Sequence, residues 1–348
     1  MAVPVVKIST TERQTFKRCR LQWHFSSYGR LNLEPILPDT RLWFGTGVHA
    51  ALEAYYGERV DPVEYWLAWT EEEFQRLDAL GFIRSGEEWE NLYAHRELGR
   101  GMLLNYVAFA TENDDFQVVA TEQQFEVPIR RPGSSQHVGF LVGRFDGICQ
   151  TADGRFWLLE HKTAAQAWSP YMFVDDDQTL GYLWAAQQLF PKPLAGVYFN
   201  ILRKKLPKPP RVLQNGKLSV AKDQDTTYEV YAATIQEQGL DPAEYTSILD
   251  HLREKGNSFF QRERVLRSPR EIEVFGAQLY DEYIDMASDP RIYPNLTWDC
   301  AWGCDYRSLC QAWRNGEDWE MIARAQFRTR DLSGTTYEPF PTDEEESV

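Results

Sequence analysis

The feature of the sequence that most constrains the fold is a run of three strand-like segments in the middle of the chain. Apolar and polar residues alternate from Phe116 to Ile129, as in a strand with one buried face. Residues 138–149 and 155–162 predict two further strands around a turn at residues 151–154. Helices before and after this meander would make an α/β core with a helical front and a helical back.

Helical patterns precede and follow the meander. Before it, apolar spacing predicts a helix from Thr10, a helix closed by Gly57, and helices over residues 62–79 and 86–110. After it, the sequence predicts in turn a helix over 177–190, a strand over 196–202, a fifth strand over 227–232, and mainly helix to about residue 287.

We therefore expect an α/β fold in which a mixed sheet is flanked by helices, organised as one composite domain. Its expected parts are a helical N-terminal part (1–110), an α/β core (111–235), C-terminal helices with a group of cysteines (236–325) and an acidic tail (326–348).

Composition indicates a soluble globular protein. The 348 residues are 43% hydrophobic and 26% charged, which excludes disorder and coiled coil for the chain as a whole. No apolar run reaches the ~18–20 residues that cross a bilayer. The first residues lack the apolar stretch of a signal peptide, so we expect a cytoplasmic location.

The net charge of −15 speaks against a nucleic-acid partner, but it conceals a gradient along the chain. Residues 61–90 carry nine acids, and more acids follow Ser333. Residues 201–222 instead hold seven Lys or Arg and no acid. The simplest interpretation of that basic stretch is a solvated loop, so net charge alone decides little.

A small set of side chains in the meander could carry chemistry. If the turn is centred near residues 152–153, Asp146 lies opposite Glu160. Because strand side chains alternate, Glu160 and Lys162 share a face while His161 points to the other. Two carboxylates beside an amine can hold a divalent cation and assist phosphodiester hydrolysis. An ordinary ion pair between Asp146 and Lys162 is the simpler alternative.

The order of motifs along the chain resembles the PD-(D/E)XK nuclease superfamily. GRFDG, followed by WLLEHKTA, resembles its D…(D/E)-x-K core. FGTGVHAALEAYY resembles the G-x-x-x-H motif of the RecB-like branch, and DDQTLGYLWAAQ resembles its Q-x-x-x-Y motif. The resemblance implies a restriction-endonuclease-like core and a site with two sets of residues. The metal ligands would be His49, Asp146, Glu160 and the backbone carbonyl of His161, and the catalytic residues Asp146, Glu160, Lys162, Gln178 and Tyr182.

Each of these residues also has a plainer interpretation. His49 has apolar neighbours and could be a core histidine, while Gln178 and Tyr182 could be a surface pair on one helix face. Glu122 precedes the strands, as a glutamate often does in this family, and its role stays open. Cys149 is best interpreted as a small buried hydrophobic residue.

The other four cysteines form a second group. Cys300, Cys304 and Cys310 crowd into WDCAWGCDYRSLC, and Cys19 lies far upstream. Four thiolates suit either zinc or an iron–sulfur cluster, and one distant cysteine with a tight trio favours a [4Fe–4S] cluster. The set resembles the four-cysteine staple of AddB and the CRISPR-associated exonucleases. Their usual trio is C-x2-C-x5-C, whereas three residues separate Cys300 from Cys304 here.

The resemblance implies a stand-alone, metal-dependent DNA exonuclease of a bacterium or phage-infected cell, acting on single strands or free ends in replication, recombination or repair. No G-x-x-x-x-G-K-[ST] motif occurs, so ATP-driven unwinding would need a helicase or another recombination or CRISPR partner protein. The alternatives are a structure- or sequence-specific endonuclease on the same fold, a non-cleaving DNA-binding assembly subunit, and a zinc-stapled scaffold.

Two groups of cationic side chains with aromatic neighbours could hold single-stranded DNA by stacking and phosphate contacts. The cationic residues are Arg203, Lys204, Lys205, Arg262, Arg264, Arg267 and Arg270, and the aromatic residues are Tyr198, Phe199, Phe259 and Phe260. The alternative is that the aromatic rings belong to the core and that the charges are solvated.

Overall fold

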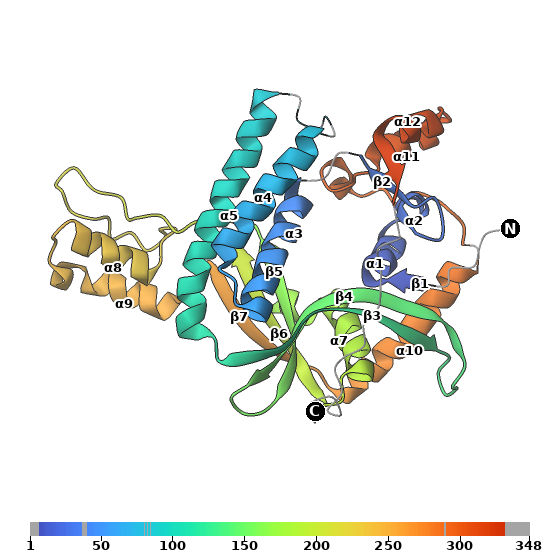
Figure 1. Cartoon of the computed structure of the whole chain (residues 1–348), viewed down its shortest axis with the longest axis horizontal. Helices are drawn as coiled ribbons and strands as arrows, with labels where there is room; N and C mark the ends of the chain where they lie inside the picture. The colour runs from blue at the N-terminus through green and yellow to red at the C-terminus, as the bar shows by residue number, and fades with distance from the viewer. Residues whose placement is uncertain are drawn as a thin grey trace.

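The computed structural model describes residues 7–36, 40–79, 81, 83, 85–288 and 290–330. A central mixed sheet has helices against both faces, which confirms the expected α/β fold (Figure 1). The strands of this sheet are β1 (Lys7–Ser9), β3 (Phe116–Arg130), β4 (His137–Thr151), β5 (Phe156–Ala164), β6 (Leu194–Arg203) and β7 (Phe260–Leu266).

The long strand β4 is the centre of the sheet. β3 pairs with it in antiparallel fashion from end to end, and so occupies one of its edges. The other edge is shared, because β1 pairs in parallel with residues 140–142 and β5 pairs in antiparallel fashion with residues 147–150. Residues 143–146 lie between these two partners. β6 continues the sheet parallel to β5, and β7 runs antiparallel to β6.

One face of the sheet is covered by α7 (Asp177–Leu189), α10 (Pro269–Ala287) and α1 (Thr10–Arg18). α7, preceded by the short α6 (Pro170–Val174), is the crossover that two parallel neighbours such as β5 and β6 require. Ser9 caps α1 in a capping box with Glu12. The buried Arg13 of α1 ties it to the other two helices, because its guanidinium pairs with Glu282 at 2.5 Å and with Asp177 at 3.5 Å.

The opposite face is covered by α3 (Thr40–Glu53), α4 (Pro62–Ala79) and α5 (Gly86–Asn113). α3 continues into a π-helical turn, η1 (Ala54–Glu58). Trp66 of α4 is fully buried between the other two helices, and its ring fills the space that Gly47 and Gly99 leave. These glycines therefore set how closely α3 and α5 approach α4.

Segments from the two ends of the chain form a lobe of their own, the cysteine lobe (residues 19–36 and 290–330). Its elements are α2 (Arg20–Ser26), β2 (Leu33–Pro35), η3 (Trp298–Ala301), α11 (Arg307–Asn315), α12 (Trp319–Gln326) and β8 (Phe327–Thr329). β2 and β8 pair in antiparallel fashion, and Leu21, Phe25 and Leu309 contribute to a separate apolar core. In Figure 1 this lobe lies apart from α3–α5, above the sheet.

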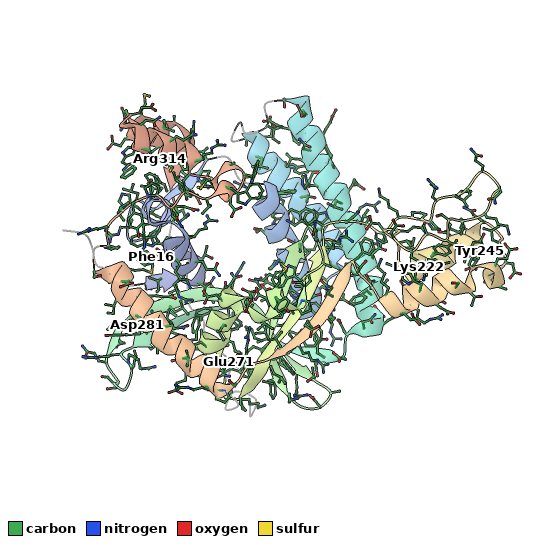
Figure 2. All side chains as sticks on the ribbon, turned by 180° about the vertical axis from the view of Figure 1, so that it is seen from behind. Phe16, Lys222, Tyr245, Glu271, Asp281 and Arg314 are labelled. Atoms are coloured by element: carbon green, nitrogen blue, oxygen red, sulfur yellow. The ribbon has the colours of Figure 1, made fainter. Side chains whose placement is uncertain are left out.

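A second small unit is inserted between β6 and β7. Residues 207–258 contain α8 (Tyr228–Glu237), η2 (Pro242–Tyr245) and α9 (Thr246–Lys255), packed around a core that includes Tyr231, Ile248 and Leu252. This insertion projects from the body beyond α5 (Figure 1). Its residues Lys222 and Tyr245 lie on the opposite side of the molecule from Phe16 of α1 (Figure 2).

Two sequence-based predictions are wrong in this region. Residues 227–232 are not a strand, because the Thr227 side chain accepts the Val230 N–H and so begins helix α8, whose buried residues Tyr231, Thr234 and Ile235 follow helical spacing. The strand that does extend the sheet is β7, within a stretch that we expected to be helical. Its sequence, FQRERVL, shows little alternation of apolar and polar residues, because three charged residues occur in succession and one of them, Arg262, is half-buried in an ion pair with Asp114.

The α/β core expected over residues 111–235 therefore gains β1 and β7 from outside that range. The division into parts within one composite domain stays a prediction. Residues 331–348, most of the expected acidic tail, lie outside the described residues. Within the described part of the chain, every helix is too short or too polar to span a membrane.

Gly99→Ala tests the packing of α4 against α5. In a helix interior, alanine is normally more favourable than glycine by about 1 kcal/mol of folding free energy. At Gly99, however, an added Cβ would lie 2.3 Å from the Trp66 ring, so we expect the free energy of unfolding to fall by about 1–3 kcal/mol. Urea unfolding measures the change. Gly86→Ala, at a helical glycine with open space around it, is the matched control and should not destabilise; equal effects of the two changes would contradict the packing argument.

Candidate active site

The site begins where β4 and β5 separate. Their ladder ends at the pair Gly147 and Leu159, which is the register expected from the turn. At the next position the His161 N–H donates to the Asp146 side chain, with 2.6 Å between N and Oδ2. A carboxylate thus replaces a backbone carbonyl as the acceptor, and the side chains of Asp146 and Glu160 both lie at the opening.

His49 reaches this point from α3. Its Nδ1 lies 3.2 Å from Oδ1 of Asp146, so the two expected metal ligands are in direct contact. Burial alone would lower the pKa of His49, but the charge and hydrogen bond of Asp146 raise it above its usual value. Burial would raise the pKa of Asp146, and His49 together with the His161 N–H brings it below its usual range instead. The pair therefore favours an ionised Asp146.

Lys162 lies beside Glu160 on β5. Its Nζ is 2.6 Å from Oε1 of Glu160 and 3.6 Å from Oδ2 of Asp176, the residue that caps α7. Burial would lower the pKa of Lys162, but these two carboxylates raise it, so the amine keeps its charge. The ion pair of Asp146 with Lys162 that we considered is therefore replaced by pairs with Glu160 and Asp176.

Gln178 and Tyr182 complete this side of the site from α7. Lys162 Nζ donates to Oε1 of Gln178 at 2.5 Å, and Gln178 Nε2 donates to the Tyr182 hydroxyl at 3.1 Å. Residues four apart on a helix share a face, which is why both reach the lysine from one helix. Gly143 of β4 leaves room for the rings of Phe125 and Tyr182, because an added Cβ would lie 2.7 Å from the first and 3.3 Å from the second.

The site suits a hard divalent cation. Glu160 is 3% exposed, and its Oε2 has no hydrogen-bond partner among the described residues. A buried carboxylate oxygen without a donor is costly unless a cation faces it. In the described part of the chain, however, no three side chains of His, Cys, Asp or Glu are arranged as a metal-binding group. At this site, His49 and Asp146 are instead hydrogen-bonded to each other.

The ring of His161 lies on the other face of β5, as alternation predicts, within a buried polar network. Its Nδ1 accepts from Asn200 Nδ2 at 2.7 Å, and its ring stacks on Tyr56 with 5.6 Å between centroids. Burial lowers the pKa of His161 to about 3, so the ring is neutral. The network continues through the Tyr106 hydroxyl to Arg262, which pairs with Asp114 of the α5 end.

The π-helical turn η1 explains how this network joins the helix that carries His49. Tyr56 lies in this turn, a short distance after His49 along the same helix. Its ring packs on His161, and its hydroxyl donates to Asp114 at 2.8 Å. π-Helical turns are rare and recur at functional sites. The helix that carries His49 therefore also packs, through Tyr56, against His161, whose backbone N–H donates to Asp146.

Glu122 lies on β3 between the residues paired with Phe145 and Gly147, and so level with Asp146. Its backbone is left-handed, with a φ of 39°, which is uncommon for a non-glycine residue. Its side chain is buried against Arg144 at 2.5 Å. Burial raises the pKa of Glu122 to about 7, partly opposed by Arg144 and reinforced by Asp146. A strained, buried carboxylate thus adjoins the site.

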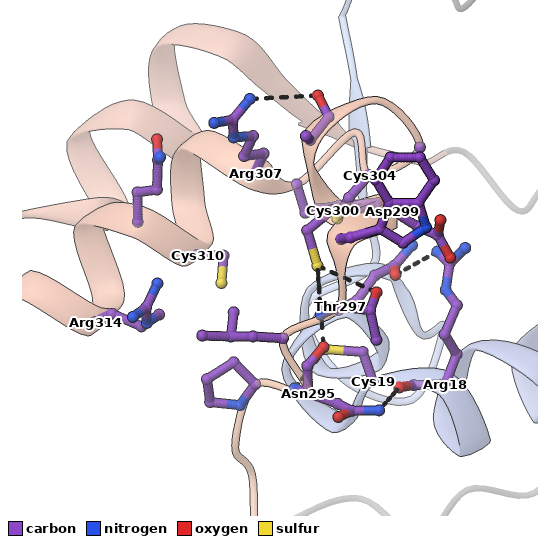
Figure 3. Close-up of a pocket in the computed structure, with 18 of the residues that line it drawn as sticks. Arg18, Cys19, Asn295, Thr297, Asp299, Cys300, Cys304, Arg307, Cys310 and Arg314 are labelled. Atoms are coloured by element: carbon purple, nitrogen blue, oxygen red, sulfur yellow. Dashed lines mark hydrogen bonds between the residues drawn. The ribbon is translucent and has the colours of Figure 1, made fainter.

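The four grouped cysteines line one cavity of about 390 Å³ in the cysteine lobe (Figure 3). Cys19 enters it from the end of α1, and the trio enters from η3, the loop after it, and α11. Sγ of Cys19 accepts the Asn295 N–H and Sγ of Cys300 accepts the Thr297 N–H, both at 3.4 Å. The hydrogen bonds from Thr297 lower the pKa of Cys300, whereas burial raises those of Cys304 and Cys310. Cys149 is fully buried in the core, as expected.

The aromatic and cationic residues proposed to hold DNA do not form an open platform. Tyr198, Phe199, Phe259 and Phe260 are buried in the core. Arg262 pairs with Asp114, Arg264 with Asp115, and Arg270 with Glu273. The buried Arg267 donates to the carbonyls of Phe173 and Val174, and Arg203 and Lys205 pair with Asp225. That hypothesis is wrong, because both faces of the sheet are covered here, so adjacent rings that point to opposite faces are all buried.

One comparison with known proteins identifies the family. The family model of the PD-(D/E)XK nuclease superfamily matches residues 7–311. The chain belongs to this superfamily. Membership implies a metal-dependent nuclease that uses divalent metals such as Mg²⁺ or Mn²⁺ and acts on DNA. A search of curated proteins found no match. Among solved structures, the crystal structure of SSO0001 aligns over 88% of this nuclease and 86% of its own chain, with 12% identity and a TM-score of 0.33.

Some residues of the nuclease site were missed from the sequence. Asp176 precedes the Q-x-x-x-Y motif and could have been found as the N-cap of the predicted helix. Tyr56 lies at the end of an expected helix, and Asn200 lies within an expected strand. The apolar spacing that predicts these elements gives no sign that either side chain belongs to a polar network. Their positions depend on tertiary contacts between α3, α5 and β6. The functions of His49, Asp146, Glu160, Lys162, Gln178 and Tyr182 stay predictions.

The raised pKa of Glu122 gives a pH dependence that a single change can isolate. The folded state binds the Glu122 proton up to about pH 7, whereas the unfolded chain releases it near pH 4.5. This contribution to stability is therefore full below pH 4.5 and lost as the pH rises to about 7. Relative to Glu122→Gln, wild type should lose about 1–3 kcal/mol of unfolding free energy across that window. Urea unfolding in EDTA measures it.

Gln124→Ala, which changes a residue of the same strand without a titratable group, is the matched control. Its difference from wild type should not change with pH. A difference between wild type and Glu122→Gln that is equally constant from pH 4.5 to 7.5 would show that Glu122 is ionised in the folded protein.

Proposed function

We propose that this chain is a metal-dependent exonuclease of the RecB-like branch that hydrolyses single-stranded or end-containing DNA. The observation that carries the proposal is the convergence of His49, Asp146, Glu160 and Lys162 where β4 and β5 separate. These residues come from one helix and two strands, so their meeting is a property of the fold and of no single motif. Gln178 and Tyr182 join them through Lys162.

The donor set supports a cation held by His49, Asp146, Glu160 and the His161 carbonyl. When bound, Mg²⁺ or Mn²⁺ would lower the pKa of a water and neutralise charge on the phosphate. Lys162 is held charged by two carboxylates and faces the same opening, so it can stabilise the charge that develops on the phosphate. Gln178 fixes the lysine amine, and the Tyr182 hydroxyl fixes Gln178.

The preference for DNA ends and the role in recombination, repair or replication rest on the motifs around His49, Gln178 and Tyr182, which resemble the RecB-like branch. A helicase or another recombination or CRISPR partner would supply unwinding. The preference for single strands and DNA ends concerns the substrate, so a cleavage assay tests it directly.

End-labelled linear single-stranded DNA with Mn²⁺ is the substrate for this assay. We expect progressive shortening by wild type and a loss of at least about 100-fold in rate for Lys162→Ala, because the transition state loses its buried cation. Lys217→Ala, which removes a lysine that pairs with Glu244 on the insertion, is the matched control and should cleave normally. The label that is lost first reports the polarity.

Other outcomes would contradict the exonuclease. Cleavage of a closed circle would indicate an endonuclease on the same fold. Intact DNA that remains bound would indicate a non-cleaving subunit. A Lys162→Ala variant that melts well below wild type would assign the lysine a structural role.

We propose further that Cys19, Cys300, Cys304 and Cys310 hold a [4Fe–4S] cluster. Support comes from the single cavity that all four line and from the backbone N–H groups that donate to the sulfurs of Cys19 and Cys300. When bound, such a cluster would act as a cross-link, joining α1 to α11. Because it would tie residues from both ends of the chain, its loss should destabilise the cysteine lobe first.

Cys304→Ala tests this cluster. We expect anaerobically purified wild type to be brown and to contain iron, and the variant to lose the visible absorbance and to melt at a lower temperature. Cys149→Ala is the matched control, since Cys149 is buried away from the cavity and should keep the absorbance. An unchanged spectrum would contradict Cys304 as a ligand, and colourless protein containing zinc would contradict the cluster.

A further inference from the structure

The cysteine lobe exposes two tryptophans that the proposed cleavage chemistry does not use. Trp298 is 76% exposed and Trp302 is 63% exposed. They flank η3, and their rings meet edge to face with 5.1 Å between centroids and 83° between planes. Trp23, Trp66 and Trp157, in contrast, are among the largest fully buried side chains. Two contacting rings left in solvent are typical of a binding surface.

The surroundings of this tryptophan pair are rich in arginine. Three arginines, Arg18, Arg307 and Arg314, line the adjoining cavity, against one carboxylate, Asp299 (Figure 3). Two of them donate to neutral groups, Arg18 to the Gln22 side chain and Arg307 to the Ala301 carbonyl, so their charges are not neutralised there. With the proposed cluster bound, its four thiolates together with Asp299 would balance the three arginines. On a chain with a net charge of −15 this surface is then locally neutral, so it repels phosphates less than the rest of the molecule while it offers them guanidinium donors.

The tryptophan pair also lies within reach of the candidate active site. α1 ends next to Cys19 at the cavity, and the Thr10 side chain at its other end hydrogen-bonds Tyr182. A helix of nine residues is ~13 Å long. Arg13 and Lys17 of α1 both pair with Asp177, next to Gln178. The cavity and the site are therefore two ends of one short, anchored helix, separated by a few nucleotides of extended DNA.

We propose that Trp298 and Trp302, with Arg18, Arg307 and Arg314, form a binding surface for single-stranded DNA. Unpaired bases stack on the two indole rings, and the guanidinium groups contact the phosphates. Stacking needs bases that are free of a duplex, which identifies the substrate as a single strand or an unpaired end. The inference rests on the proposed function, because this surface would hold the strand that the same active site cleaves.

The test compares binding of labelled oligo(dT) by fluorescence anisotropy in EDTA, where no cleavage occurs. Stacking contributes about 1–3 kcal/mol per base, so Trp298→Ala with Trp302→Ala should weaken binding at least tenfold. Trp298→Phe with Trp302→Phe keeps two rings and should recover most of the affinity. Trp313→Ala, which removes a 37% exposed tryptophan from α11 of the same lobe, is the matched control and should bind within twofold of wild type. Arg314→Gln should reduce the salt dependence of binding.

A second readout separates this surface from the nuclease itself. Hydrolysis of bis(4-nitrophenyl) phosphate with Mn²⁺ needs the active site and no strand-binding surface, so it should be equal in wild type and in the double alanine variant. Unchanged oligo(dT) affinity in the double alanine variant would overturn the surface, whatever the hydrolysis. Tenfold weaker binding with no hydrolysis by wild type would support the surface and overturn the nuclease. A dimer in sedimentation that the double alanine variant alone disrupts would overturn the inference in favour of a contact between two copies.

Discussion

The Asp146 carboxylate holds β4 and β5 apart and collects the candidate active site around it. One oxygen accepts the His161 N–H in place of a ladder bond, and the other contacts His49. Had the ladder continued, Asp146 and Glu160 would face each other across a closed sheet. Because the ladder ends one pair earlier, α3 can bring His49 to the gap and α7 can bring Gln178 to Lys162. The site therefore depends on an interruption in the pairing of the sheet.

This interruption is supported from both faces. On one face, Arg13 joins α1 to Asp177 and Glu282, next to the residues that hold Lys162. On the other, Tyr56 after α3 and Asn200 of β6 enclose the His161 ring, and Trp66 packs against Gly47 of α3 and Gly99 of α5. Few of these supports are motif residues. They explain why a short D…E-x-K pattern specifies a site only within a large, packed fold.

Most of the sheet and the main site residues could be predicted from the sequence because they depend on local patterns. Alternation identifies β3, β4 and β5, and the turn at residues 151–154 fixes the register that brings Asp146 to Glu160. The prediction of secondary structure and burial failed where contacts with residues distant in sequence override the local pattern. Arg262 is charged yet half-buried, because its guanidinium binds Tyr106 of α5 and Asp114 at the end of that helix, and Thr227 has strand propensity yet caps a helix. Tyr56 and Asn200 gain their roles only from neighbours distant in sequence.

The cysteine lobe combines segments that are distant in sequence, which affects the order in which the protein folds during synthesis. Cys19 is synthesised near the start, and its three partners follow only after about 290 further residues. At roughly 5–20 residues per second, Cys19 waits on the order of 15–60 seconds without them. The insertion of residues 207–258, in contrast, is contiguous and can pack its core as soon as it emerges. The four-cysteine cavity can therefore close only after Cys310 emerges, so any group that it holds enters a chain whose central sheet has already been synthesised.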